Sequence, residues 1–197
     1  MQFRAFEKGI EVNGTTVFAV VDGIGAFKSL AKKYLLEAGI GTEKNGEYVI
    51  DLNGWYSHEN WLKAFQNIAR DIGDSVLKEI GMKIPENAQF PPWVQDIDSA
   101  IKSIDVAYHM NHRKDGKVLF DITTGKMFEG IGHYGYERVK DEHKIISACR
   151  NPYPCAFDEG IIKSMAKKFE AKAVVHHDNT KPCRKNGAES CTYIITW

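Results

Sequence analysis

Residues 183–191 read Cys-Arg-Lys-Asn-Gly-Ala-Glu-Ser-Cys, so two thiols flank the dipeptide Asn186-Gly187. Asn-Gly favours a tight reversal of the chain, because glycine adopts positive φ angles without steric cost. A three-residue loop centred on Gly187 would make this segment a β-hairpin and set Cys183 directly opposite Cys191. Cross-strand neighbours lie close enough to share a metal ion or to form a disulfide. The segment therefore predicts a closing hairpin that carries two potential ligands.

The cysteines of the chain are confined to its last quarter. Cys149, Cys155, Cys183 and Cys191 follow a stretch of 148 residues that contains none. Thiols gathered at one end suggest a single local site, either a metal centre or a pair of disulfides. We find no signal peptide and no apolar run long enough to span a bilayer, so we expect a cytoplasmic protein without a membrane partner. A reducing compartment favours metal over disulfides, and zinc is the first hypothesis.

The composition is that of an ordinary globular protein. Hydrophobic residues make up 43% and charged residues 26% of the 197 residues, and the formal net charge is zero. A chain of this length suits one domain with a sizeable core. Because there is no excess of positive charge to attract nucleic acid or an anionic membrane, we expect neither as a partner.

The N-terminal half is predicted to be mainly helical. Residues 9–12 and 15–21 flank Asn13-Gly14, and this pattern predicts a β-hairpin at the start of the chain. Apolar residues at helical spacing then predict four helices, with Ser57 as an N-cap and Gly73 as a stop. These helices span residues 26–37, 57–72, 75–80 and 94–104.

From about residue 106 the pattern changes to short β-type runs. Turn signals separate them at residues 114–116, 124–125 and 141–142. One helix over residues 157–169 and two strands over residues 173–177 and 192–197 complete the chain. Helices followed by an antiparallel sheet with one packed helix define an α+β fold. We predict a single α+β ligand-binding domain, mainly helical over residues 1–105 and sheet-rich over residues 106–197.

The order of elements in the C-terminal part carries a family resemblance. A strand leads to the helix that opens Cys155-Ala-Phe-Asp-Glu-Gly-Ile-Ile-Lys-Ser-Met, a second strand follows, and Cys183-x7-Cys191 comes last. Over residues 106–197 this resembles the 4-vinyl reductase domain family, whose members bind small molecules. The fold of that family is similar to that of heme nitric-oxide-binding sensors.

The resemblance implies a zinc site. Three thiolates match the family's ligands, those of Cys155, Cys183 and Cys191. The fourth ligand of the family is an acidic residue about three positions before the paired cysteines, where this chain has Thr180. Three other residues could take that place, namely His177, Asp178 and Cys149. A site ligated entirely by protein would be structural. Free buried cysteines or a Cys183–Cys191 bridge are the alternatives.

A second candidate site lies at Tyr108-His109-Met110-Asn111-His112, which we place directly after the last N-terminal helix. Either His109 or His112 could bind a heme or another metal, with Tyr108 as a neighbouring contact. The Tyr-x-Ser-x-Arg signature with which the heme sensors hold the heme propionates is absent. Another tetrapyrrole is therefore a second cofactor hypothesis beside zinc.

We expect the chain to bind a small apolar or aromatic ligand. Residues such as Trp61, Trp93 and Tyr134 combine an apolar ring with one polar group and suit a cavity for a planar molecule. Since no catalytic motif is present, we expect a sensor that works by conformational change rather than an enzyme. The resemblance also implies a homodimer formed through the helices. Two alternatives stay open: a tetrapyrrole enzyme or accessory protein that uses His109 or His112, and a scaffold that holds a lipid chain.

Overall fold

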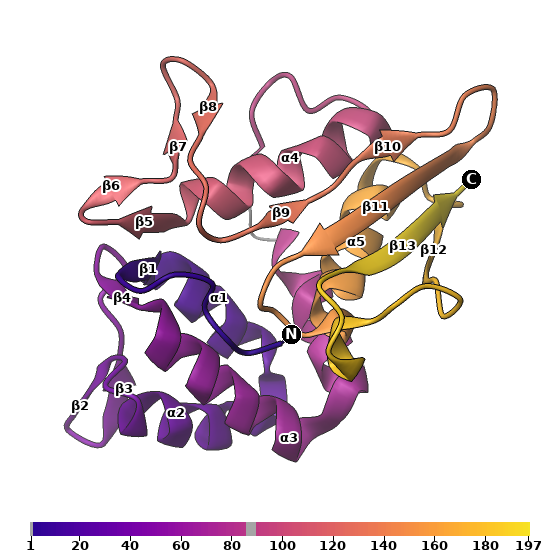
Figure 1. The fold of residues 1–197 in the computed structure, drawn as a ribbon. Coiled ribbons are helices and arrows are strands. Elements are labelled where there is room, and N and C mark those ends of the chain that lie inside the picture. Colours follow the sequence, from indigo (N-terminus) through magenta and orange to yellow (C-terminus); the bar gives the residue numbers. More distant parts are fainter. Residues whose placement is uncertain (1, 86–89) are drawn as a thin grey trace.

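The computed structural model describes residues 2–85 and 90–197. Three helices lie together on one side of the molecule (Figure 1): α1 (Gly14–Gly23), α2 (Lys28–Glu37) and α3 (His58–Lys83). The other side holds α5 (Cys155–Phe169) behind a sheet formed by β10 (Glu137–Arg138), β11 (Lys144–Arg150), β13 (Cys191–Thr196) and β12 (Val174–His177). The predicted α+β fold class is confirmed.

The start of the chain differs from the predicted hairpin. The strand β1 (Ile10–Asn13) is followed directly by helix α1, so the second predicted strand is wrong. The Asn13 side chain accepts a hydrogen bond from Thr16 N–H at 2.9 Å and caps the helix. Val17, Val20 and Val21 are buried on one helical face. Asn13-Gly14 therefore marks a strand-to-helix junction, where the same residue types that favour turns serve as a cap.

The two helices predicted on either side of Gly73 form one helix, α3, which is kinked at this glycine. Ser57 caps α3 by accepting a hydrogen bond from Asn60 N–H, as predicted. Gly73 interrupts α3 with φ 77° and ψ 172°, a conformation that strongly favours glycine. The first predicted helix corresponds to α2, preceded by a short 3-10 turn over Gly25–Phe27. A small ribbon of β2 (Thr42–Lys44) and β3 (Glu47–Val49) was not predicted.

Helix α4 (Ile97–Met110) begins and ends later than the predicted helix. Asp96 caps it through a capping box with Ser99, which starts the helix at residue 97. Its buried face continues from Ile104 to Tyr108, one further turn. Tyr108 and His109 therefore lie within the helix and not directly after it, whereas His112 begins the strand β5 (His112–Lys114).

The strands form two main antiparallel sheets. In the first, β1 lies between β4 (Trp55–Ser57) and β5, and β6 (Lys117–Val118) pairs with β5. In the second, the order is β10-β11-β13-β12, and β9 (His133–Tyr134) also pairs with β11. The short hairpin of β7 (Phe120–Asp121) and β8 (Lys126–Met127) projects from the body of the molecule (Figure 1). The turns predicted at 114–116 and 124–125 are the tips of the β5–β6 and β7–β8 hairpins.

Residues 183–191 do not form the predicted β-hairpin. Both edges of β13 are occupied, by β11 and by β12, so no edge is left to pair with the segment that begins at Cys183. Residues Arg184–Asn186 form a 3-10 turn (η3), which Gly187 closes with φ 90°. In register, Cys191 lies opposite Cys149. Glycine is needed at position 187, but it ends a helical turn instead of a β-turn.

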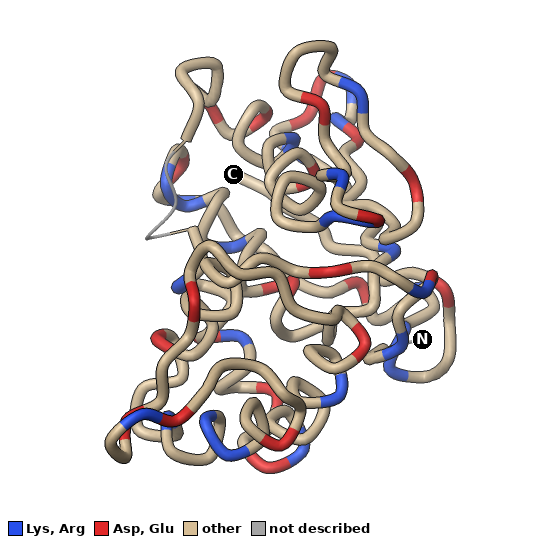
Figure 2. The backbone as a smooth tube through the Cα atoms, turned by 90° about the vertical axis from the view of Figure 1, so that its left-hand side faces the viewer, with Lys and Arg blue, Asp and Glu red and all other residues tan. Residues whose placement is uncertain are grey.

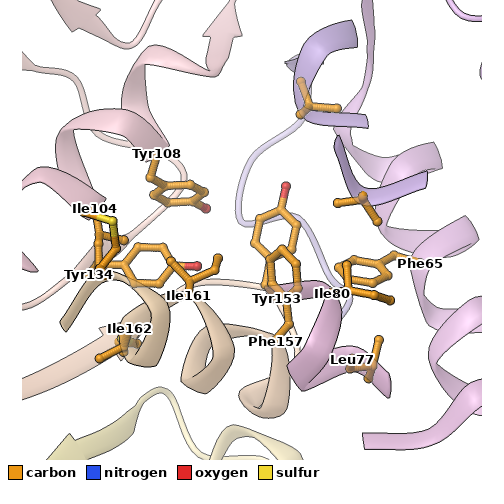
Figure 3. Packing of buried hydrophobic residues seen from close by; sticks show 14 of the residues in the cluster. Phe65, Leu77, Ile80, Ile104, Tyr108, Tyr134, Tyr153, Phe157, Ile161 and Ile162 are labelled. Carbon is orange, nitrogen blue, oxygen red and sulfur yellow. The ribbon is translucent and has the colours of Figure 1, made fainter. Parts of the chain in front are cut away.

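The core joins α3 to α5 at a close crossing. A Cβ atom on Gly160 of α5 would lie 2.1 Å from Lys78 O, and one on Gly81 of α3 would lie 2.1 Å from Phe157 O. Glycine at both positions lets the two backbones touch. Figure 3 shows residues of these helices packed around this crossing, among them Phe65, Leu77, Ile80, Phe157 and Ile161.

Charges of both signs are distributed over the molecule. Figure 2 shows Lys and Arg alternating with Asp and Glu along the backbone, in keeping with the zero net charge. None of the helices in residues 2–85 and 90–197 has the length and apolar character that crossing a membrane requires.

Candidate functional site

Four potential metal ligands meet at one end of the second sheet. Cys155 begins α5, His177 ends β12, Cys183 precedes η3 and Cys191 begins β13, and their ligand atoms all lie within 4.8 Å of one another. The Sγ–Sγ distances are 3.0 Å for Cys155–Cys191, 3.4 Å for Cys155–Cys183 and 3.7 Å for Cys183–Cys191. Thiolates that share a tetrahedral zinc ion lie about 3.8 Å apart, given Zn–S bonds of about 2.3 Å. The thiols are thus spaced close to what zinc requires without forming a disulfide.

His177 has the environment of a metal ligand. Its Nδ1 lies 3.1 Å from Asn179 Oδ1, and its Nε2 is buried without a hydrogen-bond partner. Since a side-chain amide oxygen can only accept, Nδ1 carries the proton and Nε2 presents a lone pair. Metal-binding histidines are commonly oriented in this way through the nitrogen that does not bind the ion. Buried polar atoms rarely stay unpaired, and a cation beside the thiols would satisfy Nε2.

The thiols of the cluster differ in acidity. A hydrogen bond from the Cys155 thiol and another from Arg184 N–H lower the pKa of Cys191. The same bond to Cys191 raises the pKa of Cys155. A surface cavity of about 450 Å³, lined in part by Cys155, His177 and Cys183, connects the cluster to solvent. A metal ion therefore has a path of entry.

Cys149 and Asp178 do not belong to this cluster. The Cys149 Sγ lies 3.5 Å from Ser147 Oγ, and burial, together with the charge of Asp158, raises the pKa of Cys149 well above its usual value. Its thiol stays protonated in the sheet. The Asp178 carboxylate instead accepts two hydrogen bonds from Thr180, one from N–H at 3.0 Å and one from the hydroxyl at 2.6 Å.

A mostly apolar cavity of about 200 Å³ lies between the two halves of the molecule, with walls from α1, α3, α4 and α5. Rings and aliphatic side chains dominate its lining, including Val20, Trp61, Phe90, Trp93, Ile104, Tyr108, Tyr134, Tyr153, Phe157, Ile161 and Met165. Figure 3 shows Tyr108, Tyr134 and Ile161 close together beside Tyr153 and Phe157. Trp93 is 48% exposed and Met110 41%, so both lie toward the mouth of the cavity.

The tyrosine and Ser103 hydroxyls of the lining are already used within the protein. Tyr108 donates its hydroxyl hydrogen to Ile131 O at 2.8 Å, and Tyr134 donates to Asp158 Oδ1 at 2.6 Å. Tyr153 accepts a hydrogen bond from Trp61 Nε1–H at 3.0 Å. The Ser103 hydroxyl donates to Ala100 O at 2.7 Å. The cavity therefore offers a ligand chiefly apolar surface.

Neither predicted histidine lines this cavity, whereas Tyr108 does. His112 donates from Nδ1 to Tyr108 O at 2.7 Å and accepts at Nε2 from the Tyr153 hydroxyl at 3.1 Å, so both of its nitrogens are occupied. His109 donates from Nδ1 to Asp105 O, and its ring lies 4.8 Å from that of His133.

Asp105, His109 and His133 form a second group with metal-ligand chemistry. Asp105 is already occupied, because it accepts hydrogen bonds from His133 Nδ1 at 2.8 Å and from Tyr134 N–H at 2.9 Å. The two imidazole rings have their centroids 4.8 Å apart and their planes inclined by 31°, and His109 Nε2 is buried without a hydrogen-bond partner. In this structure the group fastens β9 to α4 through the two hydrogen bonds that Asp105 accepts.

Three residues around these sites were not identified from sequence: His58, Tyr153 and Arg184. Both nitrogens of His58 are buried without a partner, and burial lowers its pKa well below the usual value, as does the nearby His112. Tyr153 contacts both His58 and His112. Only the position of Arg184 directly after a ligand cysteine was a usable signal.

No protein-family model matches this sequence. No curated protein matches it significantly either. Solved structures of H-NOX proteins, however, are similar to it across nearly the whole chain. A triple mutant of an H-NOX protein from S. oneidensis in the Fe(II) ligation state has a TM-score of 0.59 at 16% identity, with 93% of this chain and 95% of that chain covered. A mutant of T. tengcongensis H-NOX has a TM-score of 0.62 at 14% identity, with 93% and 96% covered.

A mutant of Cs H-NOX is also similar, with a TM-score of 0.63 at 14% identity and coverage of 93% of this chain and 95% of that chain. At such low identities the likeness concerns the fold. It confirms the predicted fold relation to heme nitric-oxide-binding sensors.

One of the similar solved structures comes from a study of heme redox potential and porphyrin distortion. The residues that line the cavity of this chain, however, do not fit a heme. Among the described lining residues there is no histidine or cysteine to bind iron and no lysine or arginine to pair with propionates. Met110 and Met165 line the cavity, but methionine serves as a heme ligand beside a histidine. The tyrosine hydroxyls are engaged elsewhere. The described part of the lining therefore offers heme neither an axial ligand nor a partner for its carboxylates.

Proposed function

We propose that this chain is a sensor domain that binds a small, mostly apolar or aromatic molecule in the cavity between its helical and sheet-rich halves. The observation that carries this proposal is the lining, in which the tyrosine and serine hydroxyls are satisfied by the protein itself. A ligand with many polar groups would lose its hydrogen bonds to water without replacement, which costs free energy for each group. A planar hydrocarbon or a simple substituted aromatic has few hydrogen bonds to water to lose, so its binding costs little of this free energy.

In the same proposal, zinc bound by Cys155, His177, Cys183 and Cys191 fixes the C-terminal segment to the start of α5. With four protein ligands the ion has no open position for water or substrate, so its role is structural. The buried, unpaired Nε2 of His177 supports this ligand set over one with Cys149 or Asp178. This arrangement also supports the resemblance to the 4-vinyl reductase domain family.

The mechanism of this sensor is conformational. A ligand that contacts α1, α3, α4 and α5 together favours the packing in which these helices enclose the cavity, and shifts the population toward it. A separate partner then detects that state. The proposal includes a homodimer formed through the helices and a cytoplasmic location.

A cavity-filling variant tests the proposal. Ile161 lines the cavity, and Ile161→Phe should reduce the affinity for small aromatic probes such as naphthalene at least tenfold, measured by isothermal titration calorimetry. Ile122→Phe is the matched control, because Ile122 is 79% exposed and lies outside the lining. Equal affinities in both variants would contradict the assignment of the cavity.

Absorbance spectroscopy separates this proposal from the tetrapyrrole alternative. Titration of the purified protein with heme should produce no stoichiometric Soret band of a histidine-ligated iron. A band that forms at one heme per chain and disappears in His109→Ala or His112→Ala would favour the tetrapyrrole protein instead.

A further inference from the structure

A charged pair is buried completely between the cavity and the metal-ligand cluster. Asp158, in the first turn of α5, and Arg184, in η3, form an ion pair in which both side chains have 0% exposure. Removing two charges from water costs several kcal/mol per ion, and such a pair seldom stabilises a fold more than apolar residues would. The position of this pair points to a role other than stability.

On one side the pair reaches the metal-ligand cluster. The Arg184 guanidinium donates to Asp158 Oδ2 and to the backbone and side-chain oxygens of Asn151. Its Nε lies 3.5 Å from Cys191 Sγ, and its backbone N–H donates to the same sulfur at 3.3 Å. Arg184 therefore contacts the Cys191 sulfur through both its main chain and its side chain.

On the other side the pair reaches the cavity. The Tyr134 hydroxyl donates to Asp158 Oδ1 at 2.6 Å, and the Tyr134 ring is part of the cavity lining. A second connection runs through Asn151, whose side-chain oxygen accepts from the backbone N–H of Tyr153, another lining residue, at 2.9 Å. The same Asn151 side chain donates to Asp158 at 3.1 Å.

A continuous set of hydrogen bonds therefore connects the cavity wall to the Cys191 sulfur, in the order Tyr134, Asp158, Arg184 and Cys191. All four side chains are buried, and Asp158 accepts hydrogen bonds from Tyr134, Asn151 and Arg184. Displacing the Tyr134 hydroxyl would leave Asp158 short of one donor in a medium of low polarity, where an unpaired group is costly. The position of the Tyr134 hydroxyl thus influences how Arg184 contacts Cys191.

We propose that ligand in the cavity and metal at the cysteine cluster bind cooperatively through the Asp158–Arg184 pair. This inference rests on the proposed function, because it requires both a ligand and an ion. A ligand packed against the Tyr134 ring holds its hydroxyl on Asp158, which holds Arg184 on the Cys191 thiolate in the geometry that metal binding needs. By thermodynamic linkage, the metal raises ligand affinity by the same factor as the ligand raises metal affinity.

The test compares the affinity of one probe in two states of the whole chain. N-phenyl-1-naphthylamine, a neutral aromatic amine that fluoresces when shielded from water, is titrated into protein loaded with one zinc ion and into protein stripped by a chelator. The wild-type protein should bind the probe at least fivefold more tightly with zinc than without it, within the range usual for coupled sites.

Tyr134→Phe isolates the proposed connection, since it removes the hydroxyl and keeps the ring in the cavity wall. The zinc effect on probe affinity should fall below twofold in this variant. Tyr136→Phe is the control, because the Tyr136 hydroxyl bonds Asp98 at 2.5 Å and takes no part in the connection; the fivefold effect should persist.

The outcomes separate the two proposals. Probe and zinc that both bind wild-type protein with affinities independent of each other would overturn the coupling and leave the sensor proposal standing. A zinc effect unchanged in Tyr134→Phe would overturn the route through the Tyr134 hydroxyl. Absence of saturable probe binding in both states would overturn the proposed function and the coupling with it.

Discussion

At the scale of single residues, the cysteines show how much of the candidate metal site their spacing in the sequence predicts. All four appear equivalent in the sequence, but only three of them meet at the cluster, and His177 supplies the fourth ligand atom. Cys149 lies opposite Cys191 in the sheet, yet its thiol is directed to Ser147. Because residues directly opposite in antiparallel strands share a face, Cys149 and Cys191 lie on the same side of the sheet. The difference is made by Cys155 at the start of α5 and Cys183 before η3, which lie beside Cys191 and not beside Cys149.

Serine substitutions distinguish these roles. Cys183→Ser removes a thiolate, and a hydroxyl is a much poorer zinc ligand, so the variant should lose its zinc almost completely. Cys149→Ser makes the same replacement of sulfur by oxygen, but outside the cluster, so this variant should retain about one zinc ion per chain. Elemental analysis of both variants, purified without chelator, measures the difference. Similar zinc contents in the two would contradict the ligand set proposed above.

At the scale of elements, the crossing of α3 and α5 depends on the absence of a side chain. An alanine at position 160 would place its Cβ 2.1 Å from Lys78 O, a separation at which the two helices must move apart. Gly160→Ala should therefore lower the free energy of unfolding by about 3 kcal/mol, the upper part of the range for overpacked sites. Chemical denaturation of the zinc-loaded protein provides the measurement.

Gly23→Ala is the matched control for this crossing. Gly23 ends α1, and a Cβ atom there would lie 3.3 Å from the Lys83 Cβ, a contact that small shifts relieve. Its effect on the free energy of unfolding should stay below about 1 kcal/mol, since alanine also favours the helix. If Gly160→Ala lowered the free energy of unfolding no more than Gly23→Ala does, the two helix backbones would have room to separate.

The elements that sequence predicts well are those whose signals are local. The helical spacing in α3 and α5 and the Ser57 cap are properties of consecutive residues, and all are found. The Asn-Gly pairs were misassigned because the same dipeptide serves a turn, a helix cap or the end of a 3-10 turn, and the choice depends on distant partners. β13 already has a strand on each edge, which residues 183–191 could not reveal by themselves.

At the scale of the whole molecule, the halves meet at a buried polar chain that the sequence could not indicate. Trp61 of α3 donates to the Tyr153 hydroxyl, and Tyr153 donates in turn to His112 Nε2. His112 completes the chain by donating to Tyr108 O of α4. Residues from three distant parts of the sequence thus share one arrangement, which requires a neutral imidazole, because a protonated Nε2 could not accept the hydrogen bond.

This requirement predicts an acid-sensitive junction. Burial lowers the pKa of His112 to about 4, whereas an unfolded chain has a histidine pKa of about 6.5. Below pH 6.5 the unfolded state therefore binds a proton that the folded state does not. The stabilisation from neutral His112 is complete above pH 6.5 and is lost as the pH falls through 4, by about 3 kcal/mol in total.

His112→Gln tests this prediction, because glutamine can donate to Tyr108 O and accept from Tyr153 without titrating. The free energy of unfolding of the wild-type protein, measured by urea denaturation, should fall between pH 7 and pH 4 by about 3 kcal/mol more than that of the variant. His143→Gln, at an exposed histidine, should follow the wild-type curve. Parallel curves for wild type and His112→Gln would mean that His112 takes up its proton at the same pH in the folded and unfolded states. Nε2–H of the protonated ring would then donate to the Tyr153 hydroxyl instead of accepting from it.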